Sequence, residues 1–173
     1  MRIRVVRGTV VDQPVDAVVT AANTALRGGS GVNGAVHAAA GPRLLAASRA
    51  LAPCPPGAAV ITPSFDLAPA QWVIHAVGPQ YRGPADASVL AAAYTASLAR
   101  ADEVGARSVA FPAISTGIYG YPAEDAAEVS VEALLNAETQ VDLVLLVSFG
   151  NHMAELWIDA LNRFECGRDA DAT

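Results

Sequence analysis

The chain has 173 residues, 53% of them hydrophobic and 16% charged, so it can bury the core of one ordinary globular domain and is not a disordered chain. Its net charge is −6 and it contains no lysine, which argues against a surface that neutralises the phosphates of a nucleic-acid duplex. The two cysteines lie far apart and the three histidines lack ligand spacing, so we expect no disulfide framework, no metal site and no cofactor. No apolar run approaches membrane-spanning length and the first residues do not read as a signal peptide, so we expect a cytoplasmic protein.

The first part of the chain alternates predicted strands and helices. Residues 2–6 alternate charged and apolar side chains like a first strand, and the valine-rich residues 15–21 read as a second strand. A loop with four glycines follows and gives way to a helix over residues 34–40. Gly41 ends this helix and Pro42 begins another, because glycine suits the position after a helix and proline suits its first turn.

The middle of the chain continues this alternation. Residues 58–62 and 72–77 predict two strands that could form a hairpin, and residues 85–103 predict a helix. After a short strand over residues 108–111, Pro122 at a first helical position starts a further helix.

The last predicted strand, residues 141–149, is almost wholly apolar, which is typical of a strand covered on both faces. An amphipathic helix over residues 152–164 closes a single domain that spans residues 1–166, and residues 167–173 are expected to form a flexible tail. The alternation predicts an α/β fold, a three-layer α/β/α sandwich with a mixed, mostly parallel sheet of six or seven strands. Ligands of such folds bind at the carboxyl ends of the strands.

The first glycine loop lies between a predicted strand and a predicted helix. Such a junction directs unpaired N–H groups and the positive end of the helix dipole at one point, so a phosphate can bind without a basic side chain. Residues 29–34 also match the dinucleotide fingerprint G-x-G-x-x-G. That fingerprint requires its first glycine directly after the strand and an acidic residue about 20 positions later, and neither condition is met, so we interpret the match as coincidental. A P-loop is excluded because the loop has no lysine.

A second glycine-bearing loop, residues 115–122, directly follows the predicted strand at residues 108–111. Taken alone, this loop reads equally well as a tight turn that caps the next helix. Two anion-binding loops in one small α/β domain indicate instead a diphosphate held between them.

Four motifs in this order and spacing resemble the macrodomain family, in particular its MacroD-type ADP-ribosyl hydrolases. The motifs are T-A-A-N-T-A-L-R-G-G-S-G-V-N-G-A-V-H-A-A-A-G, C-P-P-G-A-A-V-I-T, V-I-H-A-V-G-P and F-P-A-I-S-T-G-I-Y-G-Y-P. The resemblance covers about residues 5–150 and implies the same fold as the residue patterns. It also implies that ADP-ribose binds in a cleft at the strand ends.

The resemblance assigns site residues by position. The ligand-binding residues that it implies for the diphosphate and the distal ribose are Gly28, Gly29, Ser30, Gly31, Val32 and Gly34 in the first loop, and Ser115, Thr116, Gly117, Ile118 and Tyr119 in the second. Phe149 matches the aromatic residue that stacks on adenine. Asn23 and Asn33 match the positions next to the distal ribose and are the candidate catalytic residues.

Three positions depart from the family pattern. Asn33 stands where MacroD-type enzymes usually have an aspartate, and an amide can orient a water molecule but cannot serve as a general base. Thr9 replaces an acid that usually accepts from the adenine amino group, and the nearby Asp12 is a candidate substitute. Thr20 replaces an asparagine at the end of the second strand.

Two functions follow from the resemblance. The first is an ADP-ribosyl hydrolase that removes ADP-ribose ester-linked to acidic side chains, or deacetylates O-acetyl-ADP-ribose, by water attack at the distal ribose. The ligand's own phosphate would supply the basicity that Asn33 lacks, and Asn33→Asp is expected to retain or raise turnover. The second is a non-catalytic ADP-ribose-binding module, which the missing aspartate favours. Processing of another ADP-ribose derivative is a third alternative. In each case we expect a monomer, from a bacterium, whose partners are ADP-ribose or ADP-ribosylated proteins.

The remaining polar residues have simpler interpretations. His37 on the alanine-rich helix and His75 within an apolar strand are expected to be structural side chains. Cys54 lies between prolines with no nearby base and is expected to pack. Glu124 and Asp125 complement the dipole at a helix start.

Overall fold

The computed structural model describes residues 1–171, and in these residues six strands form one mixed sheet in the order β1-β6-β5-β2-β4-β3. Neighbouring strands run parallel except for β3 and β4, which form the predicted antiparallel hairpin. The mixed, mostly parallel sheet expected from the sequence is therefore confirmed. Its strands are β1 (Arg2–Arg7), β2 (Ala17–Ala21), β3 (Ala59–Pro63), β4 (Trp72–Ala76), β5 (Ser108–Phe111) and β6 (Leu143–Ser148).

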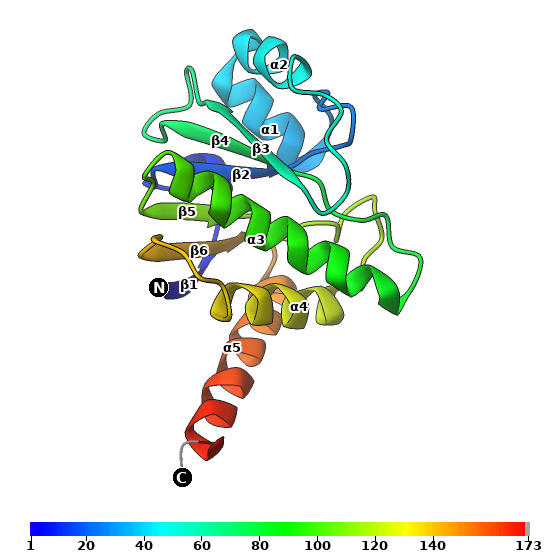
Figure 1. The fold of residues 1–173 in the computed structure, drawn as a ribbon, viewed down its shortest axis with the longest axis vertical. Coiled ribbons are helices and arrows are strands. Elements are labelled where there is room, and N and C mark those ends of the chain that lie inside the picture. Colours follow the sequence, from blue (N-terminus) through cyan, green and yellow to red (C-terminus); the bar gives the residue numbers. More distant parts are fainter. Residues whose placement is uncertain (172–173) are drawn as a thin grey trace.

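Helices pack on both faces of the sheet, which gives the predicted three-layer sandwich (Figure 1). Helices α3, α4 and α5 cover one face, and α1 and α2 cover the other. The α-helices are α1 (Gly31–Ala40), α2 (Pro42–Arg49), α3 (Ala87–Glu103), α4 (Ala123–Leu135) and α5 (Asn151–Asp171), and two short 3-10 helices are η1 (Val10–Asp12) and η2 (Pro84–Asp86).

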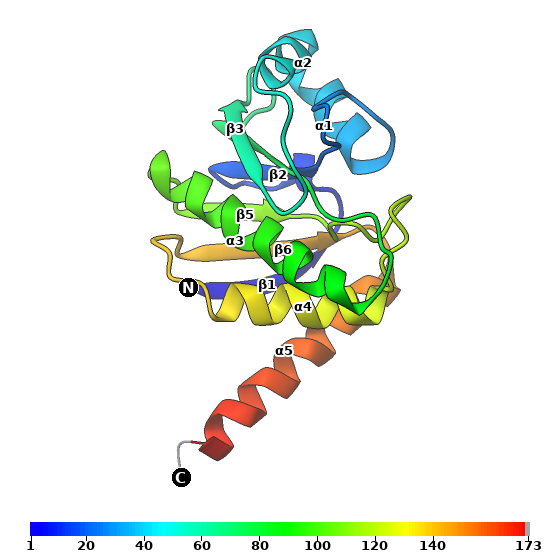
Figure 2. The ribbon, with the colours of Figure 1, turned by 45° about the vertical axis from the view of Figure 1, so that its right-hand side comes forward.

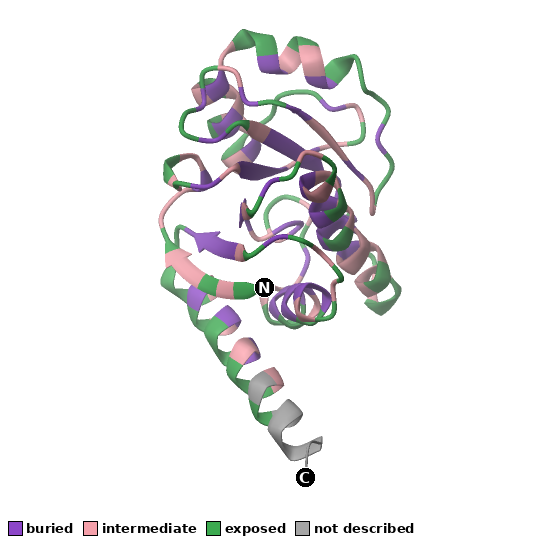
Figure 3. Cartoon of the chain, turned by 60° about the vertical axis from the view of Figure 1, so that its left-hand side comes forward, coloured by how far each residue is buried: buried purple, intermediate pink, exposed green. Residues whose placement is uncertain are grey.

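The sheet separates two apolar cores because successive side chains along a strand point to opposite faces. On β2, Val19 packs toward α3, α4 and α5, whereas its neighbour Val18 packs toward α1. Figure 3 shows the strands mostly in the colour of buried residues, with buried residues on the helices. The apolar run over residues 141–149 becomes β6, which lies between β1 and β5 and is buried from Val144 to Ser148.

The boundaries of several helices differ from the predictions, and α3 begins at Ala87 and not at residue 85. α1 begins at Gly31 and not at residue 34, so the last glycines of the first loop form the first turn of the helix. Pro122 is the N-cap of α4 and not its first helical residue. α5 continues past the predicted end at residue 164 to Asp171, and residues 172 and 173 of the expected tail lie outside the described residues.

None of the helices within residues 1–171 combines the length and the hydropathy that a membrane crossing requires.

Candidate functional site

A cavity of about 440 Å³ opens at the carboxyl ends of the parallel strands. Residues that follow β1, β2, β4, β5 and β6 line it, together with the first turn of α1. Figure 2 shows the loop ahead of α1 and the loop ahead of α4 on the same side of the molecule, at the end of the sheet towards which β6 points. This end is where open α/β sheets bind their ligands.

The first glycine loop forms one wall of the cavity through Gly29, Ser30, Gly31 and Val32. Gly31 has a φ of 58°, in the left-handed region that favours glycine. The side chain of Ser30, the N-cap of α1, makes no capping hydrogen bond. The N–H groups of Gly31, Val32 and Asn33 therefore have no acceptor within the helix. These donors and the helix dipole together suit an anion.

Gly28 and Gly34, both predicted to bind ligand, do not line the cavity. A Cβ atom at Gly34 would come within 2.5 Å of the Gly29 carbonyl oxygen, and one at Gly28 would lie 3.8 Å from the His37 ring. Gly34 therefore lets the loop pack closely on α1 and contributes to the shape of the loop, whereas a Cβ atom at Gly28 would make only an ordinary contact.

Residues 112–119, which include most of the second glycine loop (residues 115–122), form another wall, and Ser115 in this loop has an unusual backbone conformation. Ser115 has a φ of 67°, which is uncommon for a residue with a side chain, and its Oγ is buried without a hydrogen-bond partner among the described residues. Gly78 makes room for this side chain, because a Cβ atom at Gly78 would overlap Ser115 Oγ. Strained backbone and an unpartnered buried hydroxyl are typical of a site that a ligand completes.

This loop also presents backbone donors. The N–H groups of Gly117, Ile118 and Tyr119 donate to no acceptor within the described part of the chain. Tyr94 of α3 anchors the start of the loop, since its hydroxyl donates to the Pro112 carbonyl at 3.3 Å and accepts from the Ile114 N–H at 3.3 Å. Burial raises the pKa of Tyr94, so its hydroxyl stays protonated.

The two candidate catalytic residues meet at one backbone group. Asn33 Nδ2 donates to the Arg27 carbonyl at 3.0 Å, and Asn23 Nδ2 donates to the same carbonyl at 3.3 Å. Asn33 Oδ1 accepts from the Thr20 hydroxyl at 3.2 Å, and Asn23 Oδ1 accepts from the Arg27 N–H at 3.0 Å. Each amide uses one of its two N–H groups and one lone pair of its oxygen within the protein, and neither amide can act as a base.

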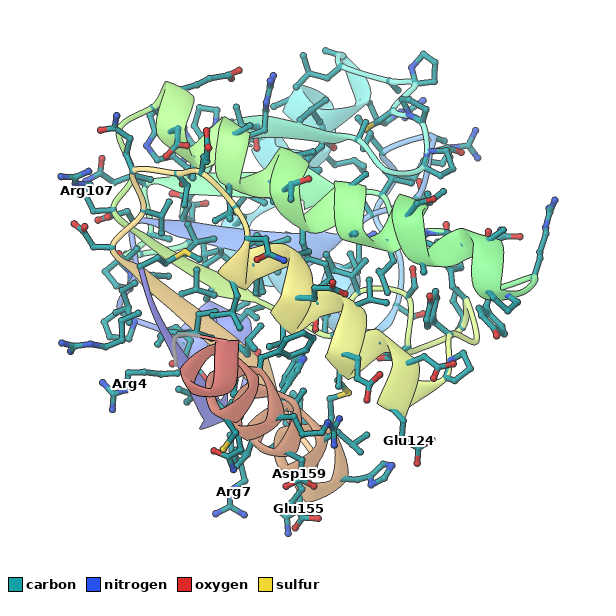
Figure 4. All side chains as sticks on the ribbon, turned by 60° about the horizontal axis from the view of Figure 1, so that its bottom comes forward. Arg4, Arg7, Arg107, Glu124, Glu155 and Asp159 are labelled. Atoms are coloured by element: carbon teal, nitrogen blue, oxygen red, sulfur yellow. The ribbon has the colours of Figure 1, made fainter. Side chains whose placement is uncertain are left out.

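The lining residues, all within residues 1–171, include no Asp, Glu, His, Lys or Arg, and Tyr119 is the one titratable side chain among them. The same part of the chain has no group of three or more His, Cys, Asp or Glu side chains that could hold a metal ion. Charged side chains lie elsewhere, and Figure 4 shows several that point away from the body of the molecule: Arg4, Arg7, Arg107, Glu124, Glu155 and Asp159. A ligand in the cavity thus meets backbone dipoles and neutral side chains.

Two large apolar side chains are exposed at the cavity. Phe149, directly after β6, is 83% exposed, and Ile118, in the second loop, is 92% exposed. Exposed apolar groups beside a concave site mark a surface that a ligand covers. Thr9 also lines the cavity, whereas Asp12, the candidate substitute for an adenine-binding acid, does not.

Two histidines and a cysteine lie outside the cavity lining. Burial, and then the neighbouring His37, lower the pKa of His75 to about 4, and burial also lowers the pKa of His37. His75 Nε2 shares a hydrogen bond with Thr62 Oγ1 at 3.0 Å, so the neutral ring is a structural side chain. Burial raises the pKa of the Cys54 thiol, which disfavours the nucleophilic thiolate.

The sequence did not identify several lining residues, among them Gly8, Gly78, Ser148 and Met153. The signal for the first three was their place at or just after the end of a strand, because the carboxyl ends of parallel strands meet at one edge of the sheet. Met153 reaches the cavity from α5, and no motif in that helix indicated it.

Comparison with known proteins identifies similar chains. The model of the Macro domain family matches residues 19–130. A protein of Klebsiella pneumoniae named O-acetyl-ADP-ribose deacetylase is 48% identical over 162 residues, which are 88% of this chain and 92% of that protein. A protein of Xenopus laevis named ADP-ribose glycohydrolase MACROD2 is 44% identical over 165 residues, which are 91% of this chain and 39% of that protein. A solved structure of an Oceanobacillus iheyensis macrodomain variant with ADPR superimposes with a TM-score of 0.88 at 34% identity, covering 94% of this chain and 92% of that one.

Proposed function

Because the chain belongs to the Macro domain family, we propose that it binds ADP-ribose in the cavity and hydrolyses an ester bond at the distal ribose. The observation that carries the binding proposal is the pair of glycine loops, which present unpaired N–H groups at a cavity without charged side chains. The names of similar proteins, a deacetylase of O-acetyl-ADP-ribose and a glycohydrolase of ADP-ribose, support the hydrolase.

The ligand is oriented by the chemistry of the walls. The diphosphate lies between the first turn of α1 and residues 115–119, where the N–H groups donate to its oxygens. The adenine stacks on the exposed ring of Phe149. This arrangement leaves the distal ribose near Asn23 and Asn33.

The reaction is water attack on an ester at the distal ribose. The bond between the ribose and the carboxyl group breaks, so that water supplies a hydroxyl group to one fragment and a proton to the other. Since no lining side chain among the described residues is a carboxylate or an imidazole, the ligand's own phosphate accepts the proton from water. The two asparagines hold the loop and the water in place, so catalysis rests on positioning.

A second function, binding without turnover, is favoured by the same absence of a base, because the Asn33 amide cannot accept the proton from water. The two functions differ in one measurement. Wild-type protein is incubated with a substrate that carries labelled ADP-ribose on a glutamate or aspartate side chain, and the released label is followed over time. The hydrolase predicts release above the spontaneous rate, whereas no release together with calorimetric binding of ADP-ribose would leave only the binding module.

The pH dependence of release tests the role of the ligand phosphate. With no lining carboxylate or histidine to titrate among the described residues, the rate is expected to change little near neutral pH. A steep rise of the rate with pH, governed by a group of the enzyme, would contradict the phosphate as proton acceptor.

A further inference from the structure

Two of the residues that depart from the family pattern, Thr20 and Asn33, contact each other in the structure. The Thr20 hydroxyl at the end of β2 donates to Asn33 Oδ1 at 3.2 Å, and both side chains are buried. Thr20 does not line the cavity. Its effect on a ligand must therefore pass through Asn33.

The other end of the Asn33 amide holds the first glycine loop. Its Nδ2 donates to the Arg27 carbonyl, which lies three residues ahead of the cavity-lining Ser30. Leu26, next to Arg27, has a φ of 50°, so this turn is in a conformation that few residues with a side chain adopt. Such a conformation persists only where the surrounding structure imposes it, and the Asn33 amide is one of the groups that hold this turn.

We propose that Thr20 is a positioning residue of the first glycine loop, because its hydroxyl fixes the Asn33 amide in the orientation that clamps the Arg27 carbonyl. The clamp sets the loop in its ligand-binding shape before a ligand arrives. The expected effect on affinity rests on the proposed binding of ADP-ribose. The effect on the shape of the loop does not, since it can be measured without ligand.

The geometry explains why an amide, and not a carboxylate, serves the clamp. Asn33 offers an acceptor to the Thr20 hydroxyl and a donor to the Arg27 carbonyl. A carboxylate at position 33 would retain the first bond and would place an anionic oxygen against the Arg27 carbonyl oxygen, with no hydrogen between them. The contacts thus predict that Asn33→Asp opens the loop at neutral pH, which differs from the retained turnover expected from the sequence.

The decisive comparison uses two substitutions of Thr20 and one matched control. Thr20→Val keeps the shape and removes the hydroxyl, whereas Thr20→Ser keeps the hydroxyl. Thr62→Val removes another buried hydroxyl of the sheet, one that bonds His75 and lies outside the cavity lining. Backbone hydrogen exchange over residues 26–30 is measured without ligand, and ADP-ribose affinity is measured by calorimetry.

Thr20→Val is expected to speed exchange in the loop and to weaken ADP-ribose binding about tenfold, because the buried Asn33 oxygen loses its donor. Thr20→Ser and Thr62→Val are expected to keep both values at the wild-type level. Unchanged loop exchange in Thr20→Val, or the same change in Thr62→Val, would overturn the clamp. If Thr20→Val speeds loop exchange as expected but the wild type binds no ADP-ribose, the proposed function would be overturned and the clamp would still be supported.

A pH profile of Asn33→Asp gives a signature that a merely structural role of the side chain would not produce. Near this residue, the loop contributes Arg27, α1 contributes His37 and β4 contributes His75, which is the register partner of Thr20, while β2 itself contributes no titratable group. When the new carboxyl group is protonated, it can donate to the Arg27 carbonyl and restore the clamp. Affinity in Asn33→Asp is expected to rise as the pH falls through the carboxyl range relative to wild type, and a parallel profile in the two proteins would overturn the proposal.

Discussion

At the scale of single residues, the cavity combines backbone donors with one exposed aromatic ring. Val32 in the first loop and Gly117 in the second each have an N–H group without a partner in the described chain. Neither loop has a basic side chain in the cavity lining. Phe149 and Ile118 are the exposed large apolar side chains among the lining residues of the described chain. Under the proposed function, recognition of ADP-ribose therefore depends on shape and on fixed dipoles, and Phe149 stacks on the adenine.

Phe149→Ala is expected to weaken ADP-ribose binding about tenfold. A base stacked on an aromatic side chain contributes about 1–3 kcal/mol, and a tenfold change in affinity corresponds to about 1.4 kcal/mol. Calorimetric titration measures the change, with Phe149→Tyr expected to retain affinity. Ile158→Ala removes another exposed apolar side chain of the C-terminal region, one that lies outside the cavity lining, and serves as the control. Equal affinity in Phe149→Ala and wild type would show that adenine does not stack there.

At the scale of elements, each glycine loop is held by a neighbour that does not belong to it. The first loop depends on β2 through Thr20, and the second depends on α3 through the Tyr94 hydroxyl. In both cases a buried hydroxyl on a regular element fixes an irregular segment. The rigid scaffold thereby gives the loops a defined shape.

Tyr94→Phe is expected to loosen the second loop. The substitution leaves the buried Ile114 N–H without its acceptor, which costs about 1–3 kcal/mol in the free energy of unfolding. It is expected to weaken ADP-ribose binding as well, because residues 115–119 lose their anchor. Thr95→Val is the control, since that hydroxyl bonds only carbonyls of its own helix, Ala91 and Ala92. Chemical denaturation and titration of both variants measure the effects, and an unchanged affinity in Tyr94→Phe would contradict the anchoring role.

The order and type of the elements could be predicted from the sequence because local patterns determine them. The alternation of residues 2–6 and the apolar run of β6 match the environments that those strands occupy. The start of α1 at Gly31 could not be predicted, because glycines favour loops locally and Gly31 itself has a left-handed φ of 58°. The contact between Thr20 and Asn33 could not be predicted from the sequence either, since it depends on how α1 packs on β2.

At the scale of the whole molecule, the face of the sheet under α1 carries buried polar side chains within an apolar core. His75 is 1% exposed and bonds Thr62, and its ring lies 6.2 Å from that of His37. A histidine that is neutral and buried in the folded protein makes stability depend on pH. The same burial that keeps these side chains out of the site makes them a titratable part of the core.

The free energy of unfolding is expected to fall as the pH decreases from about 6.5 to about 4. The pKa of His75 is about 4 in the folded protein, whereas the ordinary value of 6.5 applies to the unfolded chain. The unfolded chain therefore binds more protons across this window. The full shift in the pKa of His75 corresponds to about 3 kcal/mol in the free energy of unfolding. This stability is present above pH 6.5 and is lost as the pH falls to about 4. Denaturation at several pH values measures the slope.

His75→Gln is expected to flatten this slope relative to wild type, because glutamine can keep the bond to Thr62 and does not titrate. His152→Gln replaces an exposed histidine at the start of α5 and is expected to leave the slope unchanged. The same slope in His75→Gln as in wild type would show that His75 does not govern the acid sensitivity.

The most direct test of the central claim is a calorimetric titration of ADP-ribose into wild type, Gly31→Glu and Gly31→Ala. A Cβ atom at Gly31 meets nothing within 4 Å, so a glutamate can extend from the turn that is proposed to bind the diphosphate, whereas alanine brings only the backbone cost of the left-handed φ. The two glycine loops predict saturable binding to wild type, weaker binding to Gly31→Ala and no measurable binding to Gly31→Glu. Equal affinity in Gly31→Glu and wild type, or no binding by wild type, would contradict the assignment of this cavity as an ADP-ribose site.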